Sequence, residues 1–298
     1  MKKMILIAAA ALSLAACSKQ KSAETTTETA ATDTVAIAGN FEVRPLASGA
    51  KLHIYLTGDE MADASFIIEG ADSLVTLEQP LFKVNADAFD AYLAGIAKPV
   101  AHRISDYHLG NTGADTIIMP EGMPAVVKGE AYSGMMQHFA QVYGDAIVAL
   151  PTGETEEVTF DVPVELAGIT FTFLHGASND FPGANILIGT DVVYSHWAPA
   201  KAHINTLYAA DIAGIDARLA ELEQILATGA TIFVGGHGAP ATADDVRFRI
   251  EYLNKIKELK STSADAATFS AALIEAYPGL PGEDGVQALA KSLYGEQA

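Results

Sequence analysis

Short runs in which apolar and polar residues alternate cover much of the chain after residue 50, a period typical of half-buried strands. In the first half of the chain these runs lie at 51–56, 65–69, 73–77 and 100–105. In the second half they lie at 158–162, 169–174, 186–188, 192–195 and 231–234. Turn-forming residues such as Gly70 and Asp72 separate neighbouring runs, so we expect each run to be a separate strand.

Other stretches change to the period of a helix. From Phe89 onward apolar residues recur at i, i+4 and i+7, and Asn85 can cap this helix. The range 212–227 has an apolar stripe along one face, and a long helix is expected near 243–259. Because two successive halves each run from strands to helices without strict alternation, the sequence predicts an α/β protein in which two sheets lie between layers of helices.

The composition restricts the partners that the protein can have. The chain of 298 residues has 37 acidic and 18 basic side chains and a net charge of −19 at pH 7. Nucleic acid and anionic lipid surfaces both need a basic counter-surface, so we exclude nucleic acid and a polybasic membrane patch. The single cysteine excludes an internal disulfide framework and a zinc site of four thiolates.

The beginning of the chain is typical of a secretory signal. Two lysines precede the apolar run 5–16, which is too short to span a bilayer as a helix, and Cys17 follows it directly. This arrangement resembles the signal peptide of a bacterial lipoprotein, in which the cysteine is lipidated and becomes the new N-terminus. The alternative is a free cysteine in an ordinary signal peptide.

These observations divide the chain into three parts. We expect residues 1–16 to be the signal peptide, 17–38 to be the lipidated Cys17 and a polar tether, and 39–298 to be the folded domain. The protein would then reside in the bacterial cell envelope, bound to a membrane by its lipid. Ser18 gives no sign of retention at the inner membrane, so we expect the outer membrane.

Three loops that follow predicted strands carry residues capable of chemistry. The first contains Asp106 and His108, the second contains Asp180, and the third is a glycine-rich loop around His237. Carboxylates and imidazoles are competent ligands for zinc, manganese and iron. Each loop alone is a weak signal, because an aspartate in a loop commonly binds its own backbone and a lone histidine is more often structural.

The order of these loops resembles the metallo-β-lactamase superfamily. A strand–helix–strand unit opens into the loop with paired ligand types, a Pro-Gly-Ala turn precedes a later strand, and a strand runs into Gly-Gly-His-Gly. The resemblance extends over about 65–259 and implies a four-layer αββα sandwich. It also implies a site for one or two metal ions at the edges of the sheets, where activated water hydrolyses esters, thioesters, amides, phosphodiesters or lactones.

The chain departs from the ligand pattern of this family at several positions. The first loop of the family reads H-x-H-x-D-H, and of these residues only His108 is retained, with Asp106 at the first position. Asp180 stands where the family has a histidine, and His196 follows the strand after which the family has a bridging aspartate. His237 matches the last ligand of the family. The acidic residue that usually ends the second strand is represented by Glu78.

The resemblance therefore implies an altered site for one divalent ion, with zinc expected first and manganese or iron as alternatives. Asp106, His108 and Asp180 would hold this ion. The second metal position keeps His237 alone, unless His196 turns inward and replaces part of it. His237, with His196, would orient a small-molecule substrate or transfer a proton. On this reading the protein is a metal-dependent hydrolase.

Two other classes of function stay open. A catalytically inactive relative could keep the cleft and bind a small molecule or a partner without any metal, and the replaced ligands favour this reading. The retention of ligand-type residues in all three loops argues against it. A purely structural lipoprotein, in which the loops meet by accident, is the third possibility.

Overall fold

The computed structural model of the protein describes residues 40–110, 113, 115–176 and 183–296. Within them, seven strands form a first sheet in the order in which they occur along the chain. These strands are β1 (Asn40–Pro45), β2 (Lys51–Leu56), β3 (Ala64–Glu69), β4 (Leu74–Leu77), β5 (Val100–Ile104), β6 (Ile117–Pro120) and β7 (Thr155–Val158). The strands from β1 to β4 pair antiparallel, whereas β4, β5, β6 and β7 run parallel to one another.

Five strands form a second sheet, in the order β12-β11-β10-β9-β8. They are β8 (Val164–Leu166), β9 (Ile169–His175), β10 (Ala184–Ile188), β11 (Val192–Ser195) and β12 (Ile232–Val234). All neighbours in this sheet are antiparallel except β11 and β12, which are parallel. The carboxyl ends of these two strands therefore meet at one edge.

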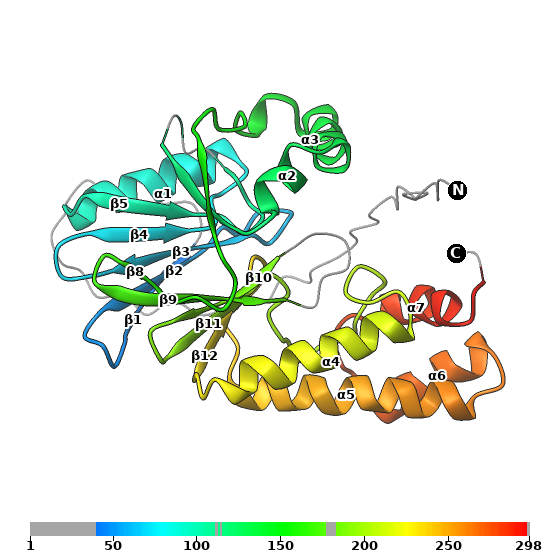
Figure 1. The fold of residues 1–298 in the computed structure, drawn as a ribbon. Coiled ribbons are helices and arrows are strands. Elements are labelled where there is room, and N and C mark those ends of the chain that lie inside the picture. The colour runs from blue at the N-terminus through cyan, green and yellow to red at the C-terminus, as the bar shows by residue number, and fades with distance from the viewer. Residues whose placement is uncertain (1–39, 111–112, 114, 177–182, 297–298) are drawn as a thin grey trace, which may run out of the picture. The chain divides into compact units, whose positions relative to one another are not determined.

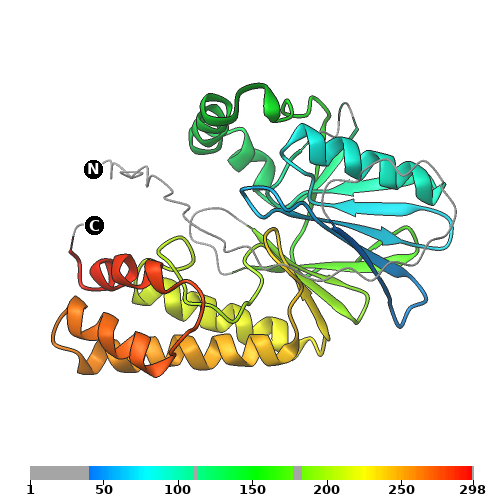
Figure 2. The same cartoon turned by 180° about the vertical axis from the view of Figure 1, so that it is seen from behind.

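Helices cover the outer faces of the two sheets (Figure 1). They are α1 (Lys83–Ile96), α2 (Met123–Val127), α3 (Glu130–Tyr143), α4 (Ile212–Ala227), α5 (Ala243–Thr262), α6 (Ala266–Ala276) and α7 (Val286–Leu293). The first sheet carries α1, and the second carries α4 and α5, with α6 and α7 beyond them (Figure 2). None of the helices in the described part of the chain is long and apolar enough to span a bilayer.

The alternation of side chains along each strand explains the layers. On β2, Ile54 belongs to the core between the two sheets, whereas the next residue, Tyr55, packs with Phe89 of α1. On β11, Tyr194 faces the core between the sheets, and Val193 packs with the residues of α4 and α5. Each sheet is thus buried on both faces, and the result is the expected αββα sandwich.

The structure differs from the sequence-based prediction in a few elements. The run 158–162 is not a strand, because β7 ends at Val158 and Asp161 adopts a left-handed backbone with φ of 60°. Asn85 does not cap α1, which begins after Phe82. Its buried side chain instead accepts a hydrogen bond from Tyr55 and donates one to Asp59. The prediction missed β1, β6, β8, α2 and α3, and its run 158–162 shares only Val158 with β7.

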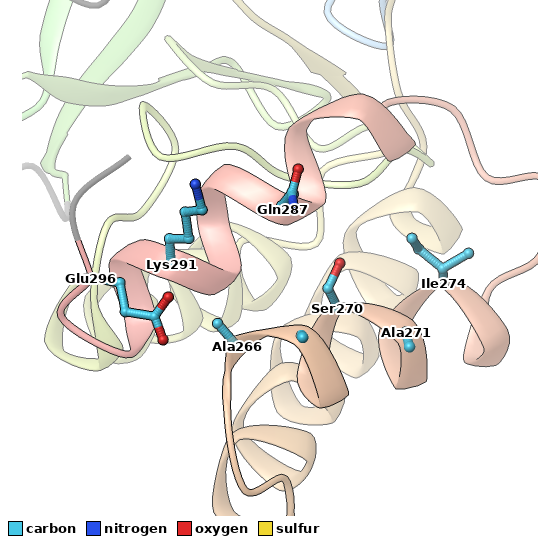
Figure 3. Close-up of a pocket in the computed structure, with 8 residues that line it drawn as sticks. Ala266, Ser270, Ala271, Ile274, Gln287, Lys291 and Glu296 are labelled. Atoms are coloured by element: carbon cyan, nitrogen blue, oxygen red, sulfur yellow. The ribbon is translucent and has the colours of Figure 1, made fainter.

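A hollow between α6 and α7 lies among the helices of the outer layer (Figure 3). Its lining comprises Ala266, Ala267, Ser270, Ala271, Ile274, Gln287, Lys291 and Glu296. It contains no histidine and a single carboxylate, so it lacks the donor set of a metal site. The chemistry of the molecule therefore has to be sought at the ends of the strands.

Candidate metal centre

The topology brings ligand-type residues together at the carboxyl ends of parallel strands. In the first sheet Glu78 follows β4, and the loop with Asp106 and His108 follows β5. In the second sheet His196 follows β11, and His237 lies shortly after β12. Parallel neighbours end at the same edge of a sheet, which is where open α/β proteins bind their ligands.

Three histidines from these loops form a compact triangle, which we call the three-histidine cluster: His108, His196 and His237. Each offers a donor nitrogen, and these nitrogens all lie within 4.8 Å of one another. The ring centroids of His108 and His196 are 5.1 Å apart, those of His108 and His237 are 4.9 Å apart, and those of His196 and His237 are 5.1 Å apart. His196 is buried, whereas the side chain of His237 is 27% exposed and gives access to the cluster.

The orientation of His237 is fixed by residues that precede β3. Nδ1 of His237 donates to the carbonyl oxygen of Met61 at 3.0 Å and lies 3.1 Å from Oδ1 of the buried Asp63. Because a carbonyl oxygen can only accept, Nδ1 carries a proton, and in the neutral ring Nε2 keeps its lone pair. A carboxylate behind an imidazole is the usual way in which proteins orient a histidine towards a metal ion.

Backbone hydrogen bonds on both sides of His237 join the two sheets. The amide of Ala64, at the start of β3, donates to the carbonyl of Gly236 at 2.8 Å, and the amide of Gly238 donates to the carbonyl of Ala62 at 2.9 Å. His237 therefore lies in a short bridge between the first and the second sheet.

Glu78 shapes the loop that carries His108. It follows β4 in a left-handed backbone conformation with φ of 58°, and it is fully buried. Its carboxylate accepts from three successive backbone amides, those of Asp106 at 2.6 Å, Tyr107 at 3.2 Å and His108 at 2.6 Å. Oε2 of Glu78 also lies 3.4 Å from Nδ1 of His108, but this buried nitrogen has no hydrogen-bond partner among the described residues.

A glycine makes room for the cluster. A Cβ atom added to Gly236 would lie 2.8 Å from Nδ1 of His196 and 3.1 Å from Cε1 of His108. A Cβ contact of 2.8 Å essentially never occurs and one of 3.1 Å is unusually tight, so any other residue here would force the ring of His196 to move.

Burial and charge set the protonation of the rings. Burial lowers the pKa of His196 well below its usual range, and the neighbouring His108 and His237 lower it further. His196 is therefore neutral and can donate a lone pair. Burial alone would lower the pKa of His237 as well, but the hydrogen bond and the charge of Asp63 outweigh this effect and raise it.

Asp106 does not join the three histidines. One oxygen of its fully buried carboxyl accepts from the amide of Ala184 at the start of β10, at 2.8 Å, and the other has no hydrogen-bond partner among the described residues. Burial raises the pKa of Asp106 well above its usual range, and the charge of Glu78 raises it further. Both effects favour the neutral form of this carboxyl, which is a weaker ligand than an ionised carboxylate.

The structure thus brings together part of the predicted site. His108 and His237 meet as expected, and His196, which the sequence assigned to orienting the substrate, lies among the potential ligands. Asp180 lies outside the described residues, so its role as a ligand stays a prediction. Asp63 was missed, because no motif marks it and its contact with His237 depends on the pairing of distant segments.

Residues of α4 and α5 hold in place the segment from Ser195 to Tyr208, which carries His196. The hydroxyl of Ser195 donates to the buried Glu221 of α4 at 3.1 Å, and Arg218 donates to the same carboxylate at 2.8 Å. The guanidinium of Arg218 lies 5.2 Å from the centre of the Tyr208 ring. Its Nε donates to the carbonyl oxygen of Tyr208 at 3.1 Å, so Arg218 also holds the backbone at Tyr208.

Arg249 of α5 holds the middle of the same segment. This side chain is 4% exposed, and it lies 5.2 Å from the centre of the Tyr208 ring and 5.5 Å from that of Tyr252. Its Nη2 donates to the carbonyl of Ala200, whereas Nε and Nη1 have no hydrogen-bond partner among the described residues. The hydrogen bond to Ala200 and the contact with the Tyr208 ring connect the loop after His196 to α5 and offset part of the cost of burying the guanidinium.

Solved structures with a similar fold place the chain in context. A metallo-β-lactamase family protein from Thermus thermophilus is 17% identical, with 81% of this chain and 90% of that chain covered and a TM-score of 0.54. A β-lactamase domain protein from Burkholderia ambifaria is 16% identical, with 87% of both chains covered and a TM-score of 0.53. The sec-alkylsulfatase Pisa1 from Pseudomonas sp. is 16% identical with a TM-score of 0.55, and 82% of this chain aligns with 48% of that chain.

The structural similarity shows a shared fold, and the fold is the αββα sandwich of the metallo-β-lactamases, as predicted. The chain spans about half the length of the alkylsulfatase. No family model matches the sequence, and no curated protein matches it either.

The role of Gly236 can be tested with a single methyl group. We expect Gly236→Ala to displace the rings of His196 and His108 and to abolish tight binding of zinc, measured by competition with a chromophoric chelator. Gly134→Ala is the matched control, because a Cβ there, on α3, meets nothing within 4 Å. That control should bind zinc normally and raise stability by up to about 1 kcal/mol. Equal zinc affinity of the two variants would contradict this account.

The fastening by α5 gives a second prediction. We expect Arg249→Met to weaken zinc binding by about tenfold, because the loop after His196 loses its tie to Ala200; outer partners of metal ligands typically contribute about 10- to 100-fold. Arg247→Met is the control, since Arg247 lies on the same helix, 57% exposed, in an ion pair with Asp244. Thermal unfolding of the metal-free variants shows whether both remain folded. If the two variants bind zinc equally, the segment does not depend on Arg249.

Proposed function

We propose that the protein is a metal-dependent hydrolase with one divalent ion, zinc first, held by His108, His196 and His237. The observation that carries this proposal is the three-histidine cluster, whose donor nitrogens lie within 4.8 Å of one another at an accessible edge of both sheets. Three imidazoles with an open fourth position are a common ligand set of catalytic zinc. Manganese and iron are the alternatives that the same donors accept.

The residues of the chain fit such an ion. His237 directs Nδ1 to Met61 and Asp63, which leaves Nε2 for the ion, and burial keeps His196 neutral. When bound, zinc supplies a Lewis acid and an activated water. Asp63 orients His237 and offsets positive charge at the site, while Glu78 holds the loop of His108 in place. The exposed edge of His237 marks the side from which a small-molecule substrate approaches.

The bound metal itself tests this proposal. The full chain, purified in mild detergent without a chelator, should contain near-stoichiometric zinc. His108→Ala and His196→Ala should each lose it, whereas His138→Ala, an exposed residue of α3, should keep it. Trp197 is the only tryptophan, and its ring stacks on His237 with centroids 5.5 Å apart, so Co²⁺ bound at the cluster should quench its fluorescence.

Two outcomes would turn the assignment towards a catalytically inactive binding module. The first is the absence of any metal after supplementation with zinc, manganese and iron. The second is a metal-loaded chain that hydrolyses no ester, thioester, amide, phosphodiester or lactone.

We also propose that Cys17 anchors the protein in the outer membrane of a bacterial envelope, with residues 18–38 as a polar tether. The support is the position of the only cysteine directly after the apolar run. When the chain is expressed in a bacterium fed with labelled palmitate, the protein should take up label and fractionate with outer membranes. Cys17→Ser should take up no label. Labelling that persists in Cys17→Ser would contradict the anchor, and Ser18→Ala is the control that should behave like the natural sequence.

A further inference from the structure

The hollow between α6 and α7 has the size and the floor of a small-molecule site (Figure 3). Its volume is about 380 Å³, within the range of roughly 300–1,000 Å³ that is usual for such sites. Helix α6 contributes Ala266, Ser270 and Ile274, which follow one another at intervals of four residues and so lie on one face. Ala267 and Ala271 follow the same interval beside them. The alanine methyl groups and Ile274 therefore form an apolar floor along about two turns of the helix.

The polar side chains that line this hollow have no other role in the structure. They are Ser270, Gln287, Lys291 and Glu296. Within the described part of the chain, none of these side chains has a hydrogen bond or an ion pair. Elsewhere in the outer layer charged side chains do pair, as Lys257 of α5 does with Asp216 of α4. The polar groups of the hollow are therefore available to a ligand.

The turn after α7 places two opposite charges at one end of the hollow. The amide of Glu296 donates to the carbonyl of Lys291 at 2.9 Å, and the amide of Gly295 donates to that of Ser292 at 3.1 Å. Gly295 has a φ of 70°, the left-handed conformation that commonly ends a helix in this way. The chain thus turns back at Glu296, whose carboxylate lines the same end of the hollow as the ammonium of Lys291, opposite Ile274 (Figure 3).

This pair of charges suits a ligand that carries both signs. A ligand with a carboxylate alone would be attracted by Lys291 and repelled by Glu296, and an amine alone would meet the reverse. Lys291 and Glu296 form no ion pair with each other, so a ligand with one ammonium and one carboxylate can bind both at once. An α-amino acid has these two groups on one carbon. An aliphatic side chain on that carbon would extend over the apolar floor towards Ile274 and be removed from water there.

We infer that the hollow between α6 and α7 is a binding site for a free α-amino acid with an aliphatic side chain. Lys291 binds its carboxylate, Glu296 binds its ammonium group, and its side chain packs on the alanine methyl groups and on Ile274. The lining contains no residue of the three-histidine cluster, so this inference does not depend on the proposed hydrolase function.

A series of ligands that differ by one group tests this inference. Titration calorimetry uses the full chain with a chelator, so that no metal ion at the three-histidine cluster can hold the amino acid. Leucine should bind at least about threefold more tightly than each of three analogues. These are 4-methylpentanoate, which lacks the ammonium group, 3-methylbutylamine, which lacks the carboxylate, and alanine, which lacks most of the side chain. The inference is overturned if leucine shows no saturable binding at millimolar concentrations, or if any analogue binds equally well.

Substitutions in the hollow assign each charge to its group. Lys291→Gln should remove the advantage of leucine over 3-methylbutylamine, and Glu296→Gln should remove its advantage over 4-methylpentanoate. Ala271→Leu should fill the floor and abolish binding of leucine. Glu275→Gln on α6 and Ala288→Leu on α7 are the controls and should bind like the natural chain, because both residues are exposed and neither lines the hollow. If the variants in the hollow bind leucine as the controls do, the amino acid binds elsewhere and the inference is wrong.

Discussion

The buried carboxylate of Glu78 is the group on which the candidate metal centre depends. An ionised carboxylate without partners would be too costly in the interior, and three successive backbone amides compensate for its burial. These amides belong to the loop that carries His108, so satisfying the carboxylate also gives the loop its shape. The charge of Glu78 also contributes to raising the pKa of Asp106. One buried carboxylate thus places a histidine at the centre and disfavours ionisation of the neighbouring acid.

This arrangement explains why the sequence foresaw only part of the site. The D-x-H spacing suggested that Asp106 and His108 point the same way, which holds for an extended segment. In the structure three consecutive amides converge on Glu78, so the segment is bent and the two side chains diverge. His196 could not be placed from its own neighbourhood, because its position at the centre depends on the parallel pairing of β11 with β12.

Most strands and the helices with a clear period were predictable, because each has one face packed against a core. The strands at 51–56 and 192–195 and the helix at 212–227 have the predicted bounds. Helix α3 escaped prediction because it buries a single residue and so lacks the apolar stripe of a core-facing helix.

The change of ligand set also changes the expected chemistry. Two carboxylates and one imidazole would reduce the Lewis acidity of an ion, whereas three neutral imidazoles preserve it. Under the proposed function the three histidines would therefore preserve the Lewis acidity of a bound ion, from positions that partly differ from those of the family pattern.

The bridge between Ala62–Ala64 and Gly236–Gly238 has a mechanical consequence. His108 follows a strand of the first sheet, and His196 and His237 follow strands of the second. An ion bound by all three would therefore link the two sheets. Any separation of the two sheets at this bridge would pull the ligands apart before either sheet unfolded. The affinity for the ion would then depend on the packing between the two sheets, and a bound ion would stabilise that packing in return.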